Sequence, residues 1–179
     1  MNLPNKLTIL RICMIPFFIV CFYLPLDFNM YLAAAVFALA YATDALDGHL
    51  ARKNGQVTDF GKLMDPIADK LLSASALIML SAKGLVHPVA VIVILSREFL
   101  ISGLRLVCAD KGVVVAASAW GKLKTVSQVI CIMAVMVLYP IGNDLLIICA
   151  DVLVWVSVAL ALISGADYVI KNRDCVSTK

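Results

Sequence analysis

The chain alternates long apolar runs with short polar breaks. Each run of Leu, Ile, Val and Ala is close to the roughly 20 residues that a helix needs to cross a bilayer. The runs predict six helical spans with these bounds: 7–25, 31–50, 63–82, 88–108, 119–139 and 144–168. Because the runs are continuous and do not alternate, a β-barrel is disfavoured. We expect an all-α integral membrane protein, with residues 1–179 as a single domain.

The composition supports this prediction, since 63% of the residues are hydrophobic and 15% are charged, against about 25% charged in a soluble domain. Residues 1–25 resemble a cleaved signal peptide only weakly, because Pro16 interrupts the apolar run and no small-residue cleavage site follows. The six cysteines contain no C-x-x-C pair, and five lie within the spans or at their ends. We interpret them as small buried residues and not as a disulfide framework or zinc site.

The basic residues predict the orientation in the membrane. Loops 26–30 and 140–143 contain no Lys or Arg, and 83–87 contains only Lys83. The loops and chain ends on the opposite side of the predicted spans contain most of the basic residues: Lys6, Arg52, Lys53, Lys62, Lys111, Lys171, Arg173 and Lys179. The positive-inside rule then places both termini in the cytoplasm of a multi-pass protein of the cell membrane. Since these cations border apolar spans, nucleic acid is not an expected partner.

Four aspartates stand out in this apolar chain: Asp44, Asp47, Asp65 and Asp69. A carboxylate at the centre of a membrane helix costs on the order of 3 kcal/mol or more. On a helix, Asp44 and Asp47 are about 60° apart, and Asp65 and Asp69 are about 40° apart. The sequence therefore predicts two acidic stripes on neighbouring helices joined by the short Asn54-Gly55 turn.

Facing carboxylates repel each other unless cations compensate them. Nearby Lys and Arg side chains would give an ion-paired helix contact, whereas Mg²⁺ would use the carboxylates as oxygen ligands. Four carboxylates from two helices suit a two-metal site, which is the interpretation we favour. The small residues Gly48, Ala51 and Gly61 share the acidic faces and would let a ligand approach closely. Arg52 is a candidate for phosphate binding, although it could also be an interfacial residue.

The complete pattern is D-x-x-D-G-x-x-A-R, eight residues, then G-x-x-x-D-x-x-x-D, from Asp44 to Asp69. This pattern resembles the signature of the CDP-alcohol phosphatidyltransferase family, with every fixed position filled. The resemblance extends along the chain and implies an intramembrane enzyme with a polar cavity open to the cytoplasm. Such an enzyme transfers a phosphatidyl group from a CDP-activated lipid to an alcohol and releases CMP. Membrane lipids surround it, and the likeness also implies a homodimer.

The resemblance implies a role for each matching residue. Asp44, Asp47, Asp65 and Asp69 would hold two Mg²⁺ or Mn²⁺ ions, and Asp69 would also accept the proton of the attacking hydroxyl. The remaining implied residues contact the CDP-lipid, with Ala51 and Gly61 leaving room for it: Asn5, Thr8, Gly48, Ala51, Arg52, Thr58 and Gly61.

A second polar cluster bears on the acceptor alcohol. Arg97 and Arg105 lie about 80° apart on one predicted helix, so both can border one cavity. Lys122 and Lys124 are about 200° apart, so at most one is expected to face it. Buried cations in a membrane usually mark a pathway or an anionic ligand, which makes Arg97, Arg105 and Lys124 candidates for an acceptor phosphate. Arg97 could instead neutralise an acidic neighbour, although adjacent helix positions diverge and argue against an Arg97–Glu98 pair.

Four short segments resemble the bacterial branch of the family that makes phosphatidylglycerophosphate: "MNLPNKLTILRICMIPFF", "DPIADKLL", "REFLISGLR" and "GKLKT". That likeness implies CDP-diacylglycerol as donor and glycerol 3-phosphate as acceptor. Inositol phosphate or serine could also be the acceptor, because the shared motif recognises only the donor. Three functions outside the family also fit carboxylates in membrane helices: an intramembrane prenyltransferase, a divalent-cation transporter, and a structural membrane protein with an ion-paired core.

Overall fold

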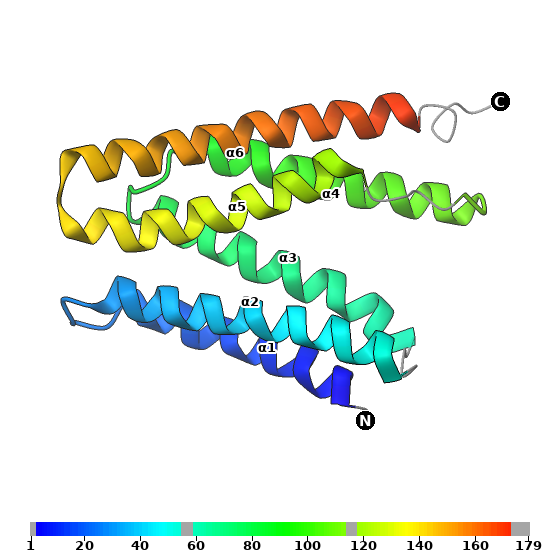
Figure 1. The fold of residues 1–179 in the computed structure, drawn as a ribbon, viewed down its shortest axis with the longest axis horizontal. Helices are drawn as coiled ribbons and strands as arrows, with labels where there is room; N and C mark the ends of the chain where they lie inside the picture. The colour runs from blue at the N-terminus through cyan, green and yellow to red at the C-terminus, as the bar shows by residue number, and fades with distance from the viewer. Residues whose placement is uncertain (1–2, 55–58, 114–117, 173–179) are drawn as a thin grey trace. The chain divides into compact units, whose positions relative to one another are not determined.

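A computed structural model describes the backbone of residues 3–54, 59–113 and 118–172. Within these ranges it describes all side chains except those of 3–8, 44–54, 59–66 and 69. The described chain is helical throughout, with no strand in these ranges, which confirms the all-α prediction (Figure 1). The helices are α1 Leu3–Cys21, α2 Asn29–Asn54, α3 Asp59–Ala82, α4 Pro88–Asp110, α5 Ala119–Leu138, the short 3₁₀ helix η1 Tyr139–Ile141, and α6 Asp144–Lys171.

Two segments of the described chain are long and apolar enough to cross a membrane, Ala119–Ile141 and Asp144–Lys171. Among the described side chains of α1, α2 and α3, shorter apolar segments are Ile9–Cys21, Asn29–Thr43 and Lys70–Ala82. In α4, Arg97, Glu98 and Arg105 interrupt an otherwise apolar helix. The residue bounds of six helices thus agree with the six predicted spans to within about four residues. The number of membrane crossings stays a prediction.

The chain divides into two compact units, Met1–Lys83 and Gly84–Lys179. The first unit contains α1, α2 and α3, and the second contains α4, α5, η1 and α6. A single domain over the whole chain stays a prediction.

In the first unit, α1 lies against both α2 and α3. Its buried face recurs every three or four residues, with Arg11, Ile15 and Phe18, as a helix with one inward face requires, and the buried Phe22 follows directly after its last residue. The Phe18 ring lies 5.1 Å from that of Phe22 and 6.0 Å from that of Phe37 on α2. These aromatic contacts join α1 to α2 near the end where the chain reverses between them (Figure 1).

In the second unit, α6 packs along α5 and also contacts α4. The reversal from α5 to α6 uses Gly142, whose φ of 71° is in the left-handed region that favours glycine. Asn143 then caps α6, because its side-chain oxygen accepts N–H groups from Leu145 at 3.0 Å and Leu146 at 3.4 Å. Small buried residues on α6, Ser157, Ala161 and Ser164, allow close helix packing.

The outward faces of the helices are also apolar. Phe99, Leu100 and Leu106 on α4 are 67%, 70% and 73% exposed, and Leu145 on α6 is 68% exposed. Large exposed apolar surfaces mark contacts with membranes or partner proteins. Exposed apolar residues also lie on the helices that carry the long apolar segments, with Val126 and Ile130 on α5 and Leu145 on α6, which favours contact with lipid.

The aromatic contacts of the first unit give a stability prediction. Phe37→Ala removes a completely buried ring and leaves a cavity beside Phe18, which we expect to cost about 3 kcal/mol. The matched control is Phe17→Ala on α1, where the ring is 69% exposed. Thermal unfolding of the detergent-purified variants should show a clear loss for Phe37→Ala only. Equal losses would contradict the packing of α1 on α2 described above.

Candidate functional site: an acidic helix pair and a cationic cluster

The acidic motif lies on two helices, as its spacing predicts. Asp44, Asp47, Gly48, Ala51 and Arg52 belong to the last part of α2. Gly61, Asp65 and Asp69 belong to the first half of α3. Since 55–58 joins the two helices, both halves of the motif lie within about three helical turns of one connection. The backbone thus brings the motif-bearing ends of α2 and α3 to the same end of the first unit (Figure 1).

Farther from this connection, α2 and α3 diverge, and α1 provides the main packing surface for both (Figure 1). The sequence predicted that the two helices are close neighbours over the motif, and they do contact each other. The side chains of Asp44, Asp47, Asp65 and Asp69, and those of the other motif residues, lie outside the described set, as do those of Asn5 and Thr8. Thr58 lies outside the described residues altogether. Among the side chains that are described, no three His, Cys, Asp or Glu residues form a metal-binding group.

Arg11 is a buried cation that was not among the predicted site residues. It is 1% exposed and continues the inward face of α1 toward the N-terminus. Thr8, one of the predicted donor-binding residues, lies three positions earlier on the same helix. The helical period of α1, which places position 11 on the same face as Ile15 and Phe18, was the signal that could have identified Arg11.

A second group of polar side chains lies inside the Gly84–Lys179 unit, and we call it the cationic cluster: Arg97, Glu98, Arg105, Lys124, Gln128 and Tyr168. Its centre is Lys124 on α5, which is completely buried. The Lys124 ammonium donates to Glu98 Oε1 on α4 and to Gln128 Oε1 one turn along α5. Glu98 thus compensates the buried charge of Lys124 across the helix interface.

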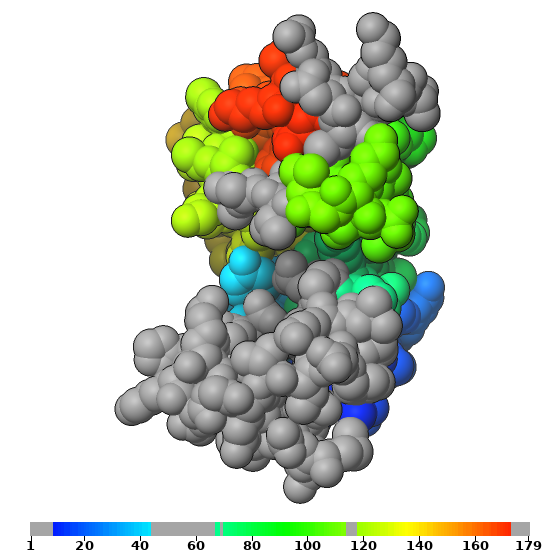
Figure 2. Space-filling view, turned by 90° about the vertical axis from the view of Figure 1, so that its right-hand side faces the viewer, coloured from blue at the N-terminus to red at the C-terminus, as the bar shows by residue number. Residues whose placement is uncertain are grey.

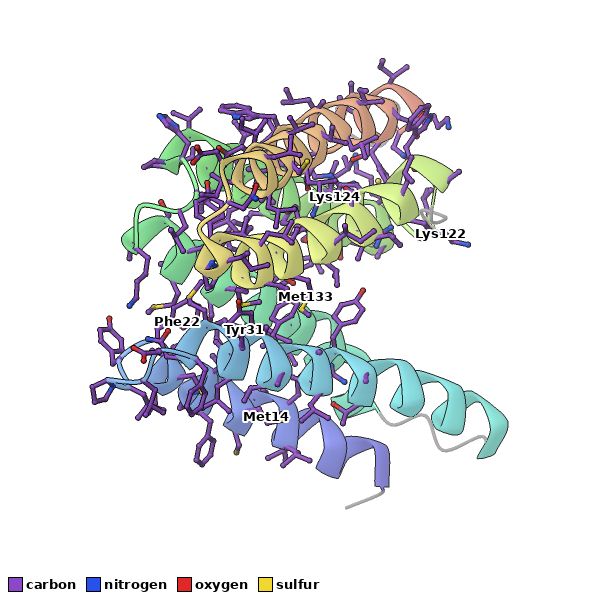
Figure 3. All side chains as sticks on the ribbon, turned by 60° about the vertical axis from the view of Figure 1, so that its left-hand side comes forward. Met14, Phe22, Tyr31, Lys122, Lys124 and Met133 are labelled. Carbon is purple, nitrogen blue, oxygen red and sulfur yellow. The ribbon has the colours of Figure 1, made fainter. Side chains whose placement is uncertain are left out.

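Lys122 differs from Lys124 as their helical positions predict. Lys122 is exposed, whereas Lys124 lies among the helices of its unit (Figure 3). Of the two lysines, only Lys124 therefore belongs to the cationic cluster.

The expectation against an Arg97–Glu98 pair was wrong. Arg97 Nη1 lies 3.7 Å from Glu98 Oε1, and the Arg97 side chain is 10% exposed. Neighbouring Cα–Cβ bonds do diverge on a helix. The two long side chains nevertheless approach each other, and Glu98 Oε1 is also the acceptor for Lys124. Gly165 on α6 leaves room for the Arg97 stem, since a Cβ there would lie 3.3 Å from Arg97 Cγ.

Tyr168 on α6 contacts both Arg97 and Arg105, and it was not among the predicted site residues. The Arg105 guanidinium carbon lies 5.1 Å from the centre of its ring, and that of Arg97 lies 5.7 Å away. The Tyr168 hydroxyl accepts Arg105 Nη2–H at 2.5 Å and the Ser118 backbone N–H at 3.1 Å. Both predicted residues, Arg97 and Arg105, thus have their guanidinium groups next to the Tyr168 ring.

The cluster extends to one end of its unit. Ser118 begins α5 as its N-cap, with its Oγ accepting the Gly121 N–H at 3.1 Å, while Arg105 and Tyr168 lie near the ends of α4 and α6. Figure 2 shows the last turns of α4, the first turns of α5 and the last turns of α6 on one face of this unit. Guanidinium and ammonium groups gathered here suit a phosphate or carboxylate ligand.

A groove with a volume of about 340 Å³ lies between α4 and α6. Its walls are mostly aliphatic, with Ile92, Leu100, Leu162 and Val169 among them, and Arg97 also lines it. This groove is apolar, so it does not correspond to the predicted polar cavity, which stays a prediction.

Comparisons with known proteins identify the family. The sequence model described as CDP-alcohol phosphatidyltransferase matches residues 1–163. A Bacillus subtilis protein named CDP-diacylglycerol–glycerol-3-phosphate 3-phosphatidyltransferase is 43% identical, covering 99% of this chain and 98% of its own length. Proteins of the same name from Haemophilus influenzae and Escherichia coli are 36% and 39% identical, covering 93% and 73% of this chain and 91% and 74% of their own lengths.

The chain belongs to the CDP-alcohol phosphatidyltransferase family. The family resemblance drawn from the motif is therefore confirmed. The match to the family model covers the acidic motif on α2 and α3 as well as Arg97, Arg105 and Lys124. It ends before Tyr168, although the similarity to the Bacillus subtilis protein covers 99% of the chain.

The buried Lys124–Glu98 pair gives a second stability prediction. Lys124→Met leaves Glu98 without its main cation in a largely apolar environment, which we expect to cost about 3 kcal/mol. Lys122→Met, the same substitution at an exposed position of the same helix, should have little effect. Thermal unfolding in detergent measures both.

Adding Glu98→Gln to Lys124→Met should restore part of the lost stability, because the uncompensated carboxylate is then removed. A double variant that is less stable than Lys124→Met alone would show that the loss of stability in Lys124→Met does not come from the unpaired Glu98 carboxylate.

Proposed function

We propose that this CDP-alcohol phosphatidyltransferase transfers the phosphatidyl group of CDP-diacylglycerol to sn-glycerol 3-phosphate. The products are phosphatidylglycerophosphate and CMP, which makes the enzyme part of anionic phospholipid synthesis. The observation that carries this proposal is the complete acidic motif on α2 and α3, in a chain that is similar over nearly its whole length to transferases of that name.

Asp44, Asp47, Asp65 and Asp69 are the proposed ligands of two Mg²⁺ or Mn²⁺ ions. Carboxylates are the oxygen donors that these hard ions prefer, and the helical spacing places each pair on one face of its helix. When bound, the ions neutralise the diphosphate of the donor and stabilise the charge on the leaving CMP. This role explains why an apolar bundle would tolerate four carboxylates within 26 residues.

Asp69 is the proposed general base. The acceptor hydroxyl oxygen forms a new bond to the phosphorus that carries diacylglycerol, the bond from that phosphorus to CMP breaks, and Asp69 takes the hydroxyl proton. For this transfer Asp69 must come within hydrogen-bond reach of the hydroxyl.

The donor is held by residues around the acidic motif. Arg52 suits bidentate binding of the diphosphate, and Thr58 provides a hydroxyl. Gly48, Ala51 and Gly61 allow the CDP group to approach the helix backbones closely. Asn5 and Thr8 contribute from the first two turns of α1. The proposed donor residues thus come from all three helices of the first unit.

The acceptor phosphate is bound by cations of the cationic cluster. Arg105 is exposed, and among the described carboxylates none forms an ion pair with it, so its charge remains available to an anion. Arg97 is mostly buried and shares Glu98 with Lys124. Arg105 is therefore the main proposed ligand of the acceptor phosphate. Arg97 adds positive charge beside it, and Lys124 adds positive charge from the interior.

The proposed location is the cell membrane, with six crossings, both termini in the cytoplasm, and a polar cavity open to that side. The long apolar segments of α5 and α6 and the uneven distribution of Lys and Arg support this orientation. We also propose a homodimer, on family likeness alone.

The reaction can be tested directly with purified protein in detergent. With CDP-diacylglycerol, Mg²⁺ and labelled glycerol 3-phosphate, label should enter the lipid phase and CMP should be released. Asp69→Asn and chelation of the metal should each reduce the rate by at least about 100-fold, the lower range for loss of a general base. The matched control is Asp27→Asn, at an exposed position between α1 and α2, which should retain full activity.

Three results would overturn parts of this proposal. CMP release with inositol phosphate or serine, but not with glycerol 3-phosphate, would keep the family and change the acceptor. Release of inorganic diphosphate would favour a prenyltransferase. Metal flux into liposomes without any CMP release would favour a transporter.

The acceptor assignment has its own test. Arg105→Ala should raise the KM for glycerol 3-phosphate by roughly tenfold or more, as expected for the loss of a charged hydrogen bond, and should leave the KM for CDP-diacylglycerol nearly unchanged. Lys111→Ala, which removes an exposed cation just beyond α4, is the control. Equal increases for both substrates would exclude Arg105 as a specific acceptor ligand.

A further inference from the structure

We propose that Tyr168 is a positioning residue that holds the Arg105 guanidinium in place for the acceptor phosphate. This inference rests on the proposed function and assigns a role to a residue that neither the motif nor the spacing of charges identifies. Tyr168 acts through Arg105 and does not itself take part in the bond changes.

The first support is the placement of the Tyr168 hydroxyl. Tyr168 is 2% exposed, so its ring is fixed by packing within its unit. Its oxygen accepts Arg105 Nη2–H from α4 and the Ser118 backbone N–H from the start of α5. One hydroxyl on α6 thereby links the ends of three helices and fixes one corner of the guanidinium.

The second support is the charge of the holding group. A carboxylate in the place of Tyr168 would form an ion pair with Arg105 and compete with a phosphate for it. A phenol is neutral at pH 7 and leaves the full charge of Arg105 available. The ring also attracts both guanidinium groups, with Arg105 at 5.1 Å and Arg97 at 5.7 Å from its centre. Tyr168 thus holds two like charges near each other without neutralising either.

The third support is the space at Gly121. A Cβ at this position would lie 3.1 Å from Tyr168 Cε2 and 3.3 Å from its hydroxyl oxygen. Glycine therefore lets the first turn of α5 lie directly against the ring. The ring cannot move toward α5, and its hydroxyl stays beside the Ser118 N–H and Arg105.

Tyr168→Phe is the decisive variant, because it keeps the ring and removes only the hydroxyl. We expect the KM for glycerol 3-phosphate to rise about tenfold, the size of effect expected for a hydrogen bond to a charged group. The KM for CDP-diacylglycerol should stay within about twofold, and kcat should change less than the acceptor KM. A purely structural role would alter both KM values together or lower the amount of active enzyme.

The matched control is Tyr139→Phe. Tyr139 also has a hydroxyl next to a charged side chain, since its OH donates to Asp151 Oδ1 at 2.5 Å, but it lies at the opposite end of α5. Its loss should leave both KM values unchanged. An equal rise in the acceptor KM for both variants would overturn the proposal.

A double-mutant cycle tests whether Tyr168 acts through Arg105. In an Arg105→Ala background, Tyr168→Phe should cause no further rise in the acceptor KM, because the group that it positions is already absent. Additive effects of the two substitutions would overturn the positioning role. If Tyr168→Phe does not yield folded protein, Gly121→Ala, which displaces the ring by a few tenths of an ångström, should raise the acceptor KM selectively, and no selective rise would count against the proposal.

The proposal can fail separately from the proposed function. If the wild-type protein forms no lipid product from glycerol 3-phosphate, the proposed reaction is wrong. If the wild type is active and Tyr168→Phe matches it in both KM values, only the role of Tyr168 is wrong.

Discussion

The compensation of charge inside an apolar helix bundle is the constraint on which the rest of this structure depends. A completely buried ammonium is costly unless an opposite charge and further hydrogen bonds satisfy it. Lys124 meets this condition by donating to the Glu98 carboxylate on α4 and to the Gln128 amide on its own helix. The same carboxylate lies 3.7 Å from Arg97. One acidic side chain therefore compensates two cations, one on α4 and one on α5.

The cations of the cluster fall into two kinds for this reason. Lys124 and Arg97 are mostly buried, and both contact the Glu98 carboxylate. Their charge is therefore partly compensated within the protein. Arg105 is exposed and is held by a neutral hydroxyl, so its charge can attract a ligand. A protein that binds an anion within an apolar environment needs both kinds, since unpaired cations in a group would otherwise repel each other.

The helices and their family were predictable from the sequence, because apolar runs and a motif with fixed spacing are local properties. The bounds of α4, α5 and α6 differ from the predicted spans by a few residues. The Arg97–Glu98 contact was not predictable from helix angles, since it depends on a third residue, Lys124, and on the room that Gly165 leaves. Tyr168 carried no signal at all, because a single tyrosine near the end of an apolar helix usually indicates the membrane interface.

In the proposed function, the two polar groups bind different substrates. The acidic motif is confined to the ends of α2 and α3 that share a connection, and in the proposed function it binds the CDP-activated donor. An acceptor phosphate needs positive charge that the protein has not already neutralised. Here that charge is placed by α4, α5 and α6, and a neutral tyrosine holds it. In the proposed function, acceptor choice can therefore change through a few side chains of these helices, while the acidic motif stays the same.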